Sequence, residues 1–304
     1  MSTISRTIYF YRVDSGLKPD GEPIPFNPIP TLEHIDKLKF DFDGKYLSDV
    51  NGRIICCWAD SKQMPCKCRL GSIRRDDLPG VENQGEITAL EIPERSGLVE
   101  QTHIVFLGNN IAGCDFNYYG PRITKFANYV AEKAVGKAPP IVNFSPVIRK
   151  DIYKQLHKMK YLKLFQLRIR APFANIIRDV NEDLAEAFEG AKRAGDADII
   201  EIILKPSRQS KGWLDEGLLE IAEKLARHPD IQYESSKFVV DGYDGEREKM
   251  VTLDLLSDKL IIKKTIARME VRSKTLNKTA AYAAIMSAYN ELKQEILNSP
   301  SISI

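Results

Sequence analysis

The stretch YLKLFQLRIRAPFANIIRDVNEDLAEAFEGAKRAGDADIIEIIL, residues 161–204, decides the fold class because three kinds of local pattern follow one another in it. Residues 161–170 have the composition of a strand, with basic and apolar side chains alternating toward the end. Residues 181–194 place apolar side chains on one helical face, and Gly195 is a residue that commonly ends a helix. Residues 199–204 form a short apolar run typical of a buried strand. This mixture of helix and strand, together with the strand-rich beginning of the chain described below, predicts an α+β protein.

Turn signals organise the beginning of the chain. We expect a strand at residues 7–13, a long Pro- and Gly-rich loop at 17–30, and a short helix at 31–38 with Thr31 as its N-cap. Asn51-Gly52 then predicts a hairpin, because this dipeptide supplies the positive-φ turn positions that a tight hairpin needs.

A second group of strands follows at residues 86–92, 103–107 and 111–119, with Asn109-Asn110 as the turn between the last two. Gly120-Pro121 ends the final strand, and the proline suits the first turn of a helix that runs to about residue 134. The N-terminal part is therefore predicted to be rich in strands and to end in a helix.

The Pro- and Gly-containing segment 136–140 predicts a hinge between two lobes. The predicted N-terminal lobe, residues 1–136, is strand-rich and ends in a helix. The C-terminal lobe, residues 137–304, is mixed and should contain helix, antiparallel strands and a basic surface. Within it we expect a β-meander at 238–271 and a long C-terminal helix at 277–297.

Composition limits the class of protein. The 304 residues are 43% hydrophobic and 28% charged, which is ordinary for a globular chain, and the net charge of +2 points to no partner by itself. No apolar run approaches the roughly 18 residues of a membrane helix, and the N-terminus has no signal-type stretch. Five cysteines are an odd number, which favours a reducing compartment over a disulfide framework. We therefore expect a cytoplasmic protein that is not embedded in a membrane.

Four of the cysteines, at positions 56, 57, 66 and 68, lie close enough in sequence to suggest a zinc site. Their spacing argues against it, because adjacent residues of a strand point to opposite faces and zinc knuckles generally use two intervening residues. We predict no metal and no cofactor.

No set of residues for a known reaction can be assembled from this sequence. The four histidines are scattered, and His103, inside an apolar strand, is predicted to be a core residue. A divergent metal-dependent nuclease using Asp198, Asp241 or Asp244 remains an alternative, although Asp198 and Glu201 fall on opposite faces of a strand. The sequence favours binding over catalysis, with no catalytic residue assigned.

Basic residues cluster in the C-terminal lobe. Residues 149–170 contain eight basic side chains against one acid, with aromatic residues among them, and three more follow the strand at 199–204. This composition is typical of a surface that contacts phosphates. Two alternatives are a solvated face that balances an acidic helix, and a scaffold or inhibitor that binds protein. The predicted DNA-contacting residues are Arg149, Lys150, Lys154, Lys158, Lys160, Lys163, Arg168, Arg170, Lys205, Arg208 and Lys211.

In segment order the chain resembles the RexA-like phage-exclusion proteins, the family of the A component of the phage lambda Rex exclusion system. The resemblance rests on four stretches in the same order: HIVFLGNNIAGCDFNYYGPRITKFANYV (103–130), FSPVIRKDIYKQLHKM (144–159), ADIIEIILKPSRQSKG (197–212) and YAAIMSAYNELKQEIL (282–297). It covers roughly residues 102–297, and the four-cysteine segment has no counterpart in it.

The resemblance implies a cytoplasmic, DNA-binding homodimer. With the basic surfaces, we expect it to bind double-stranded DNA through the backbone and with low sequence specificity. It also implies a role in antiviral defence by phage exclusion or abortive infection, with a membrane effector encoded nearby. Small residues at positions 280, 284 and 288 give an independent reason to expect homodimerisation, since they allow close helix packing. They could equally pack inside the same chain.

Overall fold

The computed structural model describes residues 2–19, 23–49, 52–139, 141–148, 152–207, 212–246, 248–256, 260–271 and 273–299. The chain divides into two compact units. Unit 1 comprises the residues up to Phe144 together with Ile261–Lys293, and unit 2 comprises Ser145–Leu260 with the chain end from Gln294. Both units combine helices with antiparallel strand pairs, so the α+β class predicted from the sequence is confirmed.

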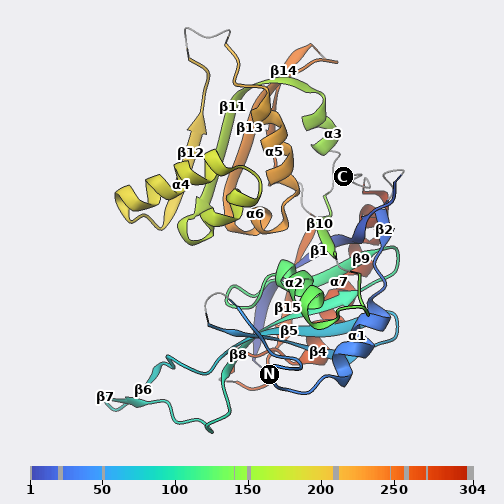
Figure 1. The fold of residues 1–304 in the computed structure, drawn as a ribbon, viewed down its shortest axis with the longest axis vertical. Helices are drawn as coiled ribbons and strands as arrows, with labels where there is room; N and C mark the ends of the chain where they lie inside the picture. The colour runs from blue at the N-terminus through green and yellow to red at the C-terminus, as the bar shows by residue number, and fades with distance from the viewer. Residues whose placement is uncertain are drawn as a thin grey trace. The chain divides into compact units, whose positions relative to one another are not determined.

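Unit 1 is built on a large sheet (Figure 1). Its strand order is β10-β1-β9-β8-β5-β4-β3, and β2 and β15 also pair with β1. The strands are β1 (Thr3–Leu17), β2 (Pro23–Pro25), β3 (Leu47–Ser48), β4 (Ile54–Ser61), β5 (Cys66–Arg74), β8 (Leu98–Phe106), β9 (Ile111–Asp115), β10 (Asn143–Pro146) and β15 (Ile261–Ala267). The long strand β1 therefore joins segments from the beginning, the middle and the end of the chain.

Helices cover both faces of this sheet. Helices α1 (Pro28–Lys37) and α2 (Ile123–Lys133) lie on one face, where Phe126 packs against Phe106 of β8. Helix α7 (Lys278–Asn298) lies on the other face, where a side chain at Gly113 of β9 would meet Ile285 at 2.8 Å. Gly113 thus permits a close approach of α7 that a larger residue would prevent.

A two-stranded hairpin, β6 (Gly80–Asn83) with β7 (Glu86–Ala89), extends away from the sheet of unit 1 (Figure 1). All eight of its strand residues are exposed. The predicted strand at 86–92 is present in this hairpin but stops at Ala89.

Unit 2 has a four-stranded sheet in the order β12-β11-β13-β14, with every pair antiparallel. Its elements are α3 (Ile152–His157), β11 (Met159–Arg170), the 3-10 helix η1 (Ala171–Asp179), α4 (Glu182–Gly195), β12 (Ile199–Leu204), α5 (Gly217–Arg227), α6 (Pro229–Glu234), β13 (Ser235–Asp244) and β14 (Lys249–Asp254). The helices pack on one face of the sheet, and a single apolar core lies between the two layers (Figure 1).

Local sequence explains several of these boundaries. Asn109 and Asn110 both adopt positive φ, at 60° and 57°, which confirms the predicted turn between β8 and β9. Asn181 caps α4 by accepting a hydrogen bond from the Leu184 backbone N–H. Helix α1, by contrast, starts earlier than predicted. Its N-cap is Asn27, not Thr31, because prolines fit the first helical positions and need no hydrogen bond there.

The C-terminal part departs from the prediction in one respect. The meander expected at 238–271 is only a β13–β14 hairpin, and β15 pairs with β1 in unit 1 instead. Residues 261–293, assigned from the sequence to a lobe of residues 137–304, therefore belong with the N-terminal segment. The lobe boundary predicted at residue 136 falls near the observed division at Phe144.

Among the described residues, none of the helices has the length and apolar character needed to cross a membrane.

Candidate nucleic-acid interface

The face of the unit 2 sheet that points away from the helices is the candidate site. Strand alternation places Leu162, Phe165 and Leu167 of β11 in the core, so their sequence neighbours point to the opposite face. The register aligns this second face across the strands, with Gln166 of β11 between Ile203 of β12 and Val239 of β13. Part of the face is apolar and open, since Ile203 is 49% exposed.

A basic row crosses this face at one end of β11. Arg168 lies between Glu201 of β12 and Lys237 of β13 in the register, and Arg170 follows two residues later on the same face. The prediction that Arg168 and Arg170 share a strand face is confirmed. Their side chains are 41% and 37% exposed, which leaves both guanidinium groups accessible from solvent.

Acidic residues partly neutralise the basic row. Arg168 Nη2 donates to Glu201 Oε2 at 2.7 Å, and Gln166 Nε2 donates to Glu201 Oε1 at 2.6 Å. These hydrogen bonds, the one from Arg168 first, lower the pKa of Glu201, so its carboxylate is ionised at neutral pH. Arg170 lies 3.9 Å from the buried Glu234. Arg168 is therefore held in place by a hydrogen-bonded acid, and Arg170 by an ion pair.

Aromatic residues gather at the other end of the same face. Tyr161 of β11 pairs with Tyr243 of β13 in the register. Trp213 stacks on Tyr161, with ring centroids 5.3 Å apart and an interplanar angle of 29°, and lies 6.0 Å from Tyr243. Lys163 places its ammonium 5.1 Å from the centre of the Trp213 ring, a cation–π contact. The backbone N–H of Leu214 donates to the Leu162 carbonyl, which holds the Trp213 segment beside β11.

The other predicted DNA-contacting residues do not all join this face. Lys154 is exposed on α3, which packs in the helical layer, and Lys158 pairs with Glu246 at 2.5 Å. Lys160 is exposed, and its side chain lies beside Gly245. Lys205 is exposed and follows directly after β12, at the edge of the sheet. Arg149, Lys150, Arg208 and Lys211 lie outside the described residues. The basic residues around the predicted strand therefore divide between two layers of unit 2.

The carboxylates of the nuclease alternative do not meet. Asp241 points to the face of the sheet that lies away from the helices, called the uncovered face below. Asp244, in contrast, is on the core side and is 3% exposed. Asp198 is exposed just before β12. Within the described part of the chain, no three His, Cys, Asp or Glu side chains come together as a metal site would require.

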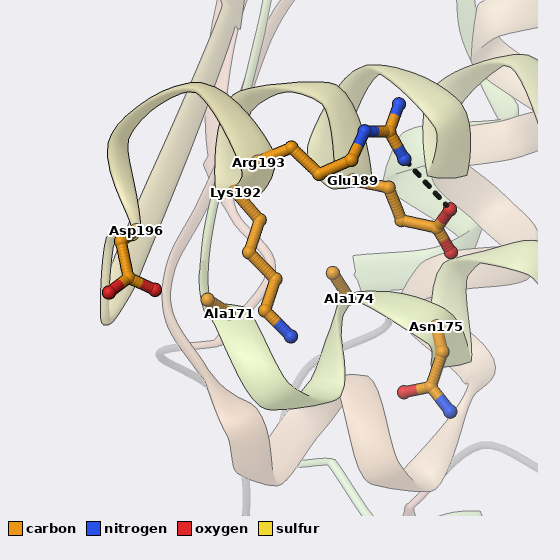
Figure 2. A pocket seen from close by; sticks show the side chains of 7 residues that line it. All are labelled: Ala171, Ala174, Asn175, Glu189, Lys192, Arg193 and Asp196. Atoms are coloured by element: carbon orange, nitrogen blue, oxygen red, sulfur yellow. Dashed lines mark ion pairs between the residues drawn. The ribbon is translucent and has the colours of Figure 1, made fainter.

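A pocket of about 540 Å³ lies between η1 and α4 in unit 2 (Figure 2). Its charged lining residues are Glu189, Lys192, Arg193 and Asp196, and the Lys192 ammonium points toward the middle of the opening. Glu189 already accepts from Arg178 at 3.0 Å and lies 3.9 Å from Arg193. The pocket lining thus carries two basic and two acidic side chains, which gives the pocket no net charge to select a charged ligand.

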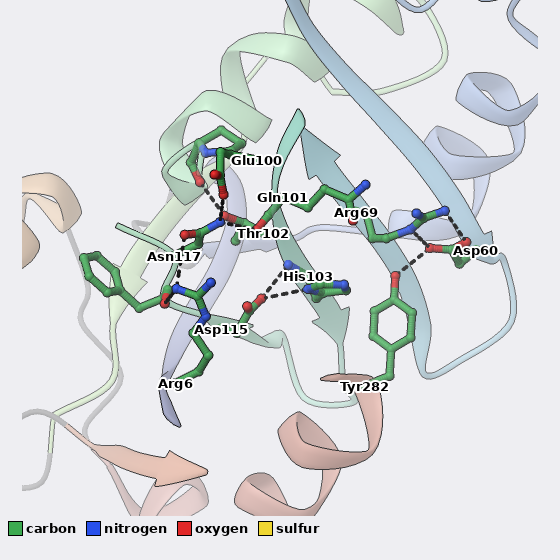
Figure 3. A network of polar contacts seen from close by, with 12 residues as sticks. Arg6, Asp60, Arg69, Glu100, Gln101, Thr102, His103, Asp115, Asn117 and Tyr282 are labelled. Atoms are coloured by element: carbon green, nitrogen blue, oxygen red, sulfur yellow. Dashed lines mark hydrogen bonds and ion pairs between the residues drawn. The ribbon is translucent and has the colours of Figure 1, made fainter. Parts of the chain in front are cut away.

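Unit 1 holds a buried polar network (Figure 3). Asp115 Oδ1 accepts from the His103 backbone N–H at 2.6 Å and lies 3.2 Å from His103 Nδ1. His103 is 1% exposed and Asp115 is fully buried, which confirms the prediction of a core histidine. The ring of His103 also meets Tyr282 of α7 edge-on at 5.6 Å.

A second part of this network ties α7 to the sheet. Arg69 makes two hydrogen bonds to Asp60, at 2.7 and 3.0 Å, and the Tyr282 hydroxyl donates to Asp60 at 2.7 Å. Burial alone would raise the pKa of Asp60, but the hydrogen bonds from Arg69 and Tyr282 bring the pKa below its usual value. Through Tyr282, both parts of the network contact α7 and hold it against the sheet of unit 1.

The cysteines are all buried thiols in the same sheet. Cys56 packs with Ile54 and Ile73 in one cluster, whereas Cys57 interacts with Cys68 on the opposite face. Adjacent cysteines therefore point apart, as strand alternation predicts. Burial raises the pKa of Cys56 to about 12, which makes it a poor nucleophile at neutral pH.

One of the three small residues expected at a dimer interface faces the interior of its own chain. Ala288 of α7 is fully buried within its own chain. The small-residue pattern of this helix is thus explained at least in part by packing against the sheet of unit 1.

Three residues of the uncovered face were not predicted from the sequence, namely Lys237, Trp213 and Tyr243. Alternation in KFVVDGYD, residues 237–244, carried the signal for Lys237 and Tyr243, since both fall between buried positions. The stacking of Trp213 on Tyr161 joins segments 52 positions apart and has no local sequence signal.

No protein-family model and no curated protein matches this chain.

Proposed function

We propose that the chain binds DNA through the uncovered face of the unit 2 sheet. The observation that carries this proposal is the row formed by Arg168, Arg170 and Lys237 on a face that no described helix of unit 2 covers. Arginine guanidinium groups match phosphate oxygens in geometry and charge, and accessible cations on a sheet release condensed counterions when they meet a DNA backbone.

The proposal includes weak sequence specificity. Backbone phosphates carry no sequence information, and the Glu201 carboxylate, which could read a base edge, already accepts hydrogen bonds from Arg168 and Gln166. Binding should therefore depend strongly on salt and weakly on base sequence.

A protein partner is the second candidate, because Ile199 and Ile203 of β12 are 58% and 49% exposed on the same face. Exposed apolar side chains also suit a protein interface. We prefer DNA because Ile199 pairs with Arg170 in the register, and the same face carries Arg168, Lys237 and, at its other end, the aromatic residues.

Crosslinking tests the proposal directly. A photoreactive DNA oligonucleotide, offered as single strand and as duplex, should crosslink to peptides of β11 and β13. The matched comparison is the helical layer of the same unit, where α4 and α5 also carry exposed lysines and arginines. Crosslinks confined to α4 and α5, or the absence of a complex with either form of DNA at low salt, would overturn the proposal.

The resemblance to RexA-like proteins suggests phage exclusion as the biological setting. Cells that express the chain should then reduce phage plating, and replacing Arg168, Arg170 and Lys237 by Gln should restore it. If phage plating stays reduced in this triple variant at equal protein level, phage exclusion does not depend on the sheet face.

A further inference from the structure

The aromatic end of the uncovered face carries exposed rings that contacts with phosphates alone would not require. Tyr161 is 37% exposed, and Trp213 and Tyr243 are partly exposed beside it. Met250 of β14 pairs with Tyr243 in the register and is 45% exposed. A soluble surface seldom gathers this many large apolar side chains unless they contact a ligand or partner.

We infer that this end of the face is a stacking site for unpaired bases, so that the chain prefers single-stranded over duplex DNA. The inference rests on the proposed function and specifies its ligand. Bases inside a duplex already stack on one another and offer only their edges, whereas an unpaired base can lie flat on an aromatic ring.

The position of Lys163 strengthens this reading. Lys163 occupies an irregular position of β11, where the register shifts between Leu162 and Leu164. Its ammonium lies 5.1 Å from the centre of the Trp213 ring. A cation held beside an aromatic ring can contact the phosphate of the nucleotide whose base stacks there. Base and phosphate recognition thus occur together at this end of the sheet.

The two ends of the face form one continuous track. Tyr161 and Arg168 are seven positions apart on β11, which corresponds to roughly 23 Å at about 3.3 Å per residue. Between them, Val239 and the exposed Ile203 provide apolar surface, and Asp241 of β13 places one carboxylate on the same face. A short single strand would stack bases on the aromatic rings and direct its phosphates toward Arg168 and Arg170.

Intrinsic fluorescence gives a direct test, because the chain has two tryptophans. In a Trp58→Phe background, Trp213 is the only tryptophan, and titration with a thymidine oligonucleotide of about 16 nucleotides should quench its emission. The same oligonucleotide annealed to its complement should quench less and bind more weakly. Equal affinity and equal quenching with both forms would overturn the inference.

Substitution of Tyr161 separates stacking from folding. Tyr161→Ala should weaken single-strand binding at least about fivefold, since stacking on one base contributes about that much or more, and should leave duplex binding unchanged. Tyr161→Phe keeps the ring and should bind single strands as wild type does. Equal weakening of single-strand and duplex binding by Tyr161→Ala, or loss of binding in Tyr161→Phe, would contradict a stacking role.

These outcomes also distinguish the inference from the proposed function. If substitution of Arg168, Arg170 and Lys237 abolishes binding while Tyr161→Ala has no effect, the phosphate contacts stand and the stacking site fails. If wild-type protein binds neither form, the proposed function itself fails. Tighter binding of an RNA oligonucleotide of equivalent sequence than of the DNA oligonucleotide would overturn the assignment to DNA.

Discussion

Removing the charge of Glu201 should strengthen DNA binding, an effect opposite in sign to that of most surface substitutions. The Glu201 carboxylate is ionised and lies 2.7 Å from Arg168, so it repels any phosphate that Arg168 contacts. Glu201→Gln keeps the size of the side chain and removes that repulsion. Because exposed ion pairs contribute about 0–1 kcal/mol to stability, the variant should fold normally.

The magnitude follows from Coulomb's law. For a phosphate about 6 Å from Glu201, with a Debye length of about 10 Å at 0.1 M salt, removal of the repulsion corresponds to roughly two- to tenfold tighter binding.

Fluorescence anisotropy of a labelled oligonucleotide at 0.1 M salt measures this change. The control is Glu220→Gln on α5, which removes the same charge from an exposed ion pair with Lys224 in the helical layer. Its affinity should stay close to that of wild type. Binding by Glu201→Gln that equals or falls below wild type would refute the placement of phosphates beside Arg168.

Two further predictions concern stability. Phe238→Ala should destabilise unit 2 by about 3 to 5 kcal/mol, because Phe238 is fully buried and meets Phe165 at 5.6 Å; a urea midpoint close to that of wild type would contradict this packing. Asp60→Asn should lower the free energy of unfolding by about 2 kcal/mol. This is less than the roughly 3 to 5 kcal/mol lost when a fully buried ion pair is broken, because Asp60 is 13% exposed. Since the pKa of Asp60 is lower in the folded than in the unfolded state, its contribution is present above about pH 4 and is lost as the pH falls further. The melting temperatures of wild type and Asp60→Asn should therefore converge in acid. A constant difference in melting temperature down to pH 2 would show that the ionised Asp60 does not stabilise the fold.

Local signals in the sequence predicted much of the secondary structure. The apolar run at β12 was predicted with its observed bounds, Ile199–Leu204, and the turn at Asn109-Asn110 was found because asparagine tolerates positive φ. Pairing between distant segments has no such signal. The β15 strand matched the pattern of its neighbour β14, yet it pairs with β1, more than 250 positions earlier in the chain.

The candidate site was predicted in part for the same reason. Alternation along β11 indicated that Arg168 and Arg170 share a face, but a single strand cannot reveal which face the helices cover. Local charge counting also grouped Lys154 with these arginines, although α3 lies in the helical layer. The aromatic end depends on Trp213, which reaches Tyr161 only after the chain has folded.

The salt dependence of DNA binding tests the central claim most directly. Each phosphate contact contributes about 0.7 to 0.9 to the slope of log affinity against log salt. Replacing Arg168, Arg170 and Lys237 together by Gln should therefore flatten the slope by about 2 to 3 units, because three contacts are lost. A matched triple variant of the helical layer, with Lys192, Arg193 and Lys224 changed to Gln, should keep the wild-type slope. An unchanged slope in the sheet-face variant, or a slope that flattens equally in both variants, would contradict DNA binding through this face.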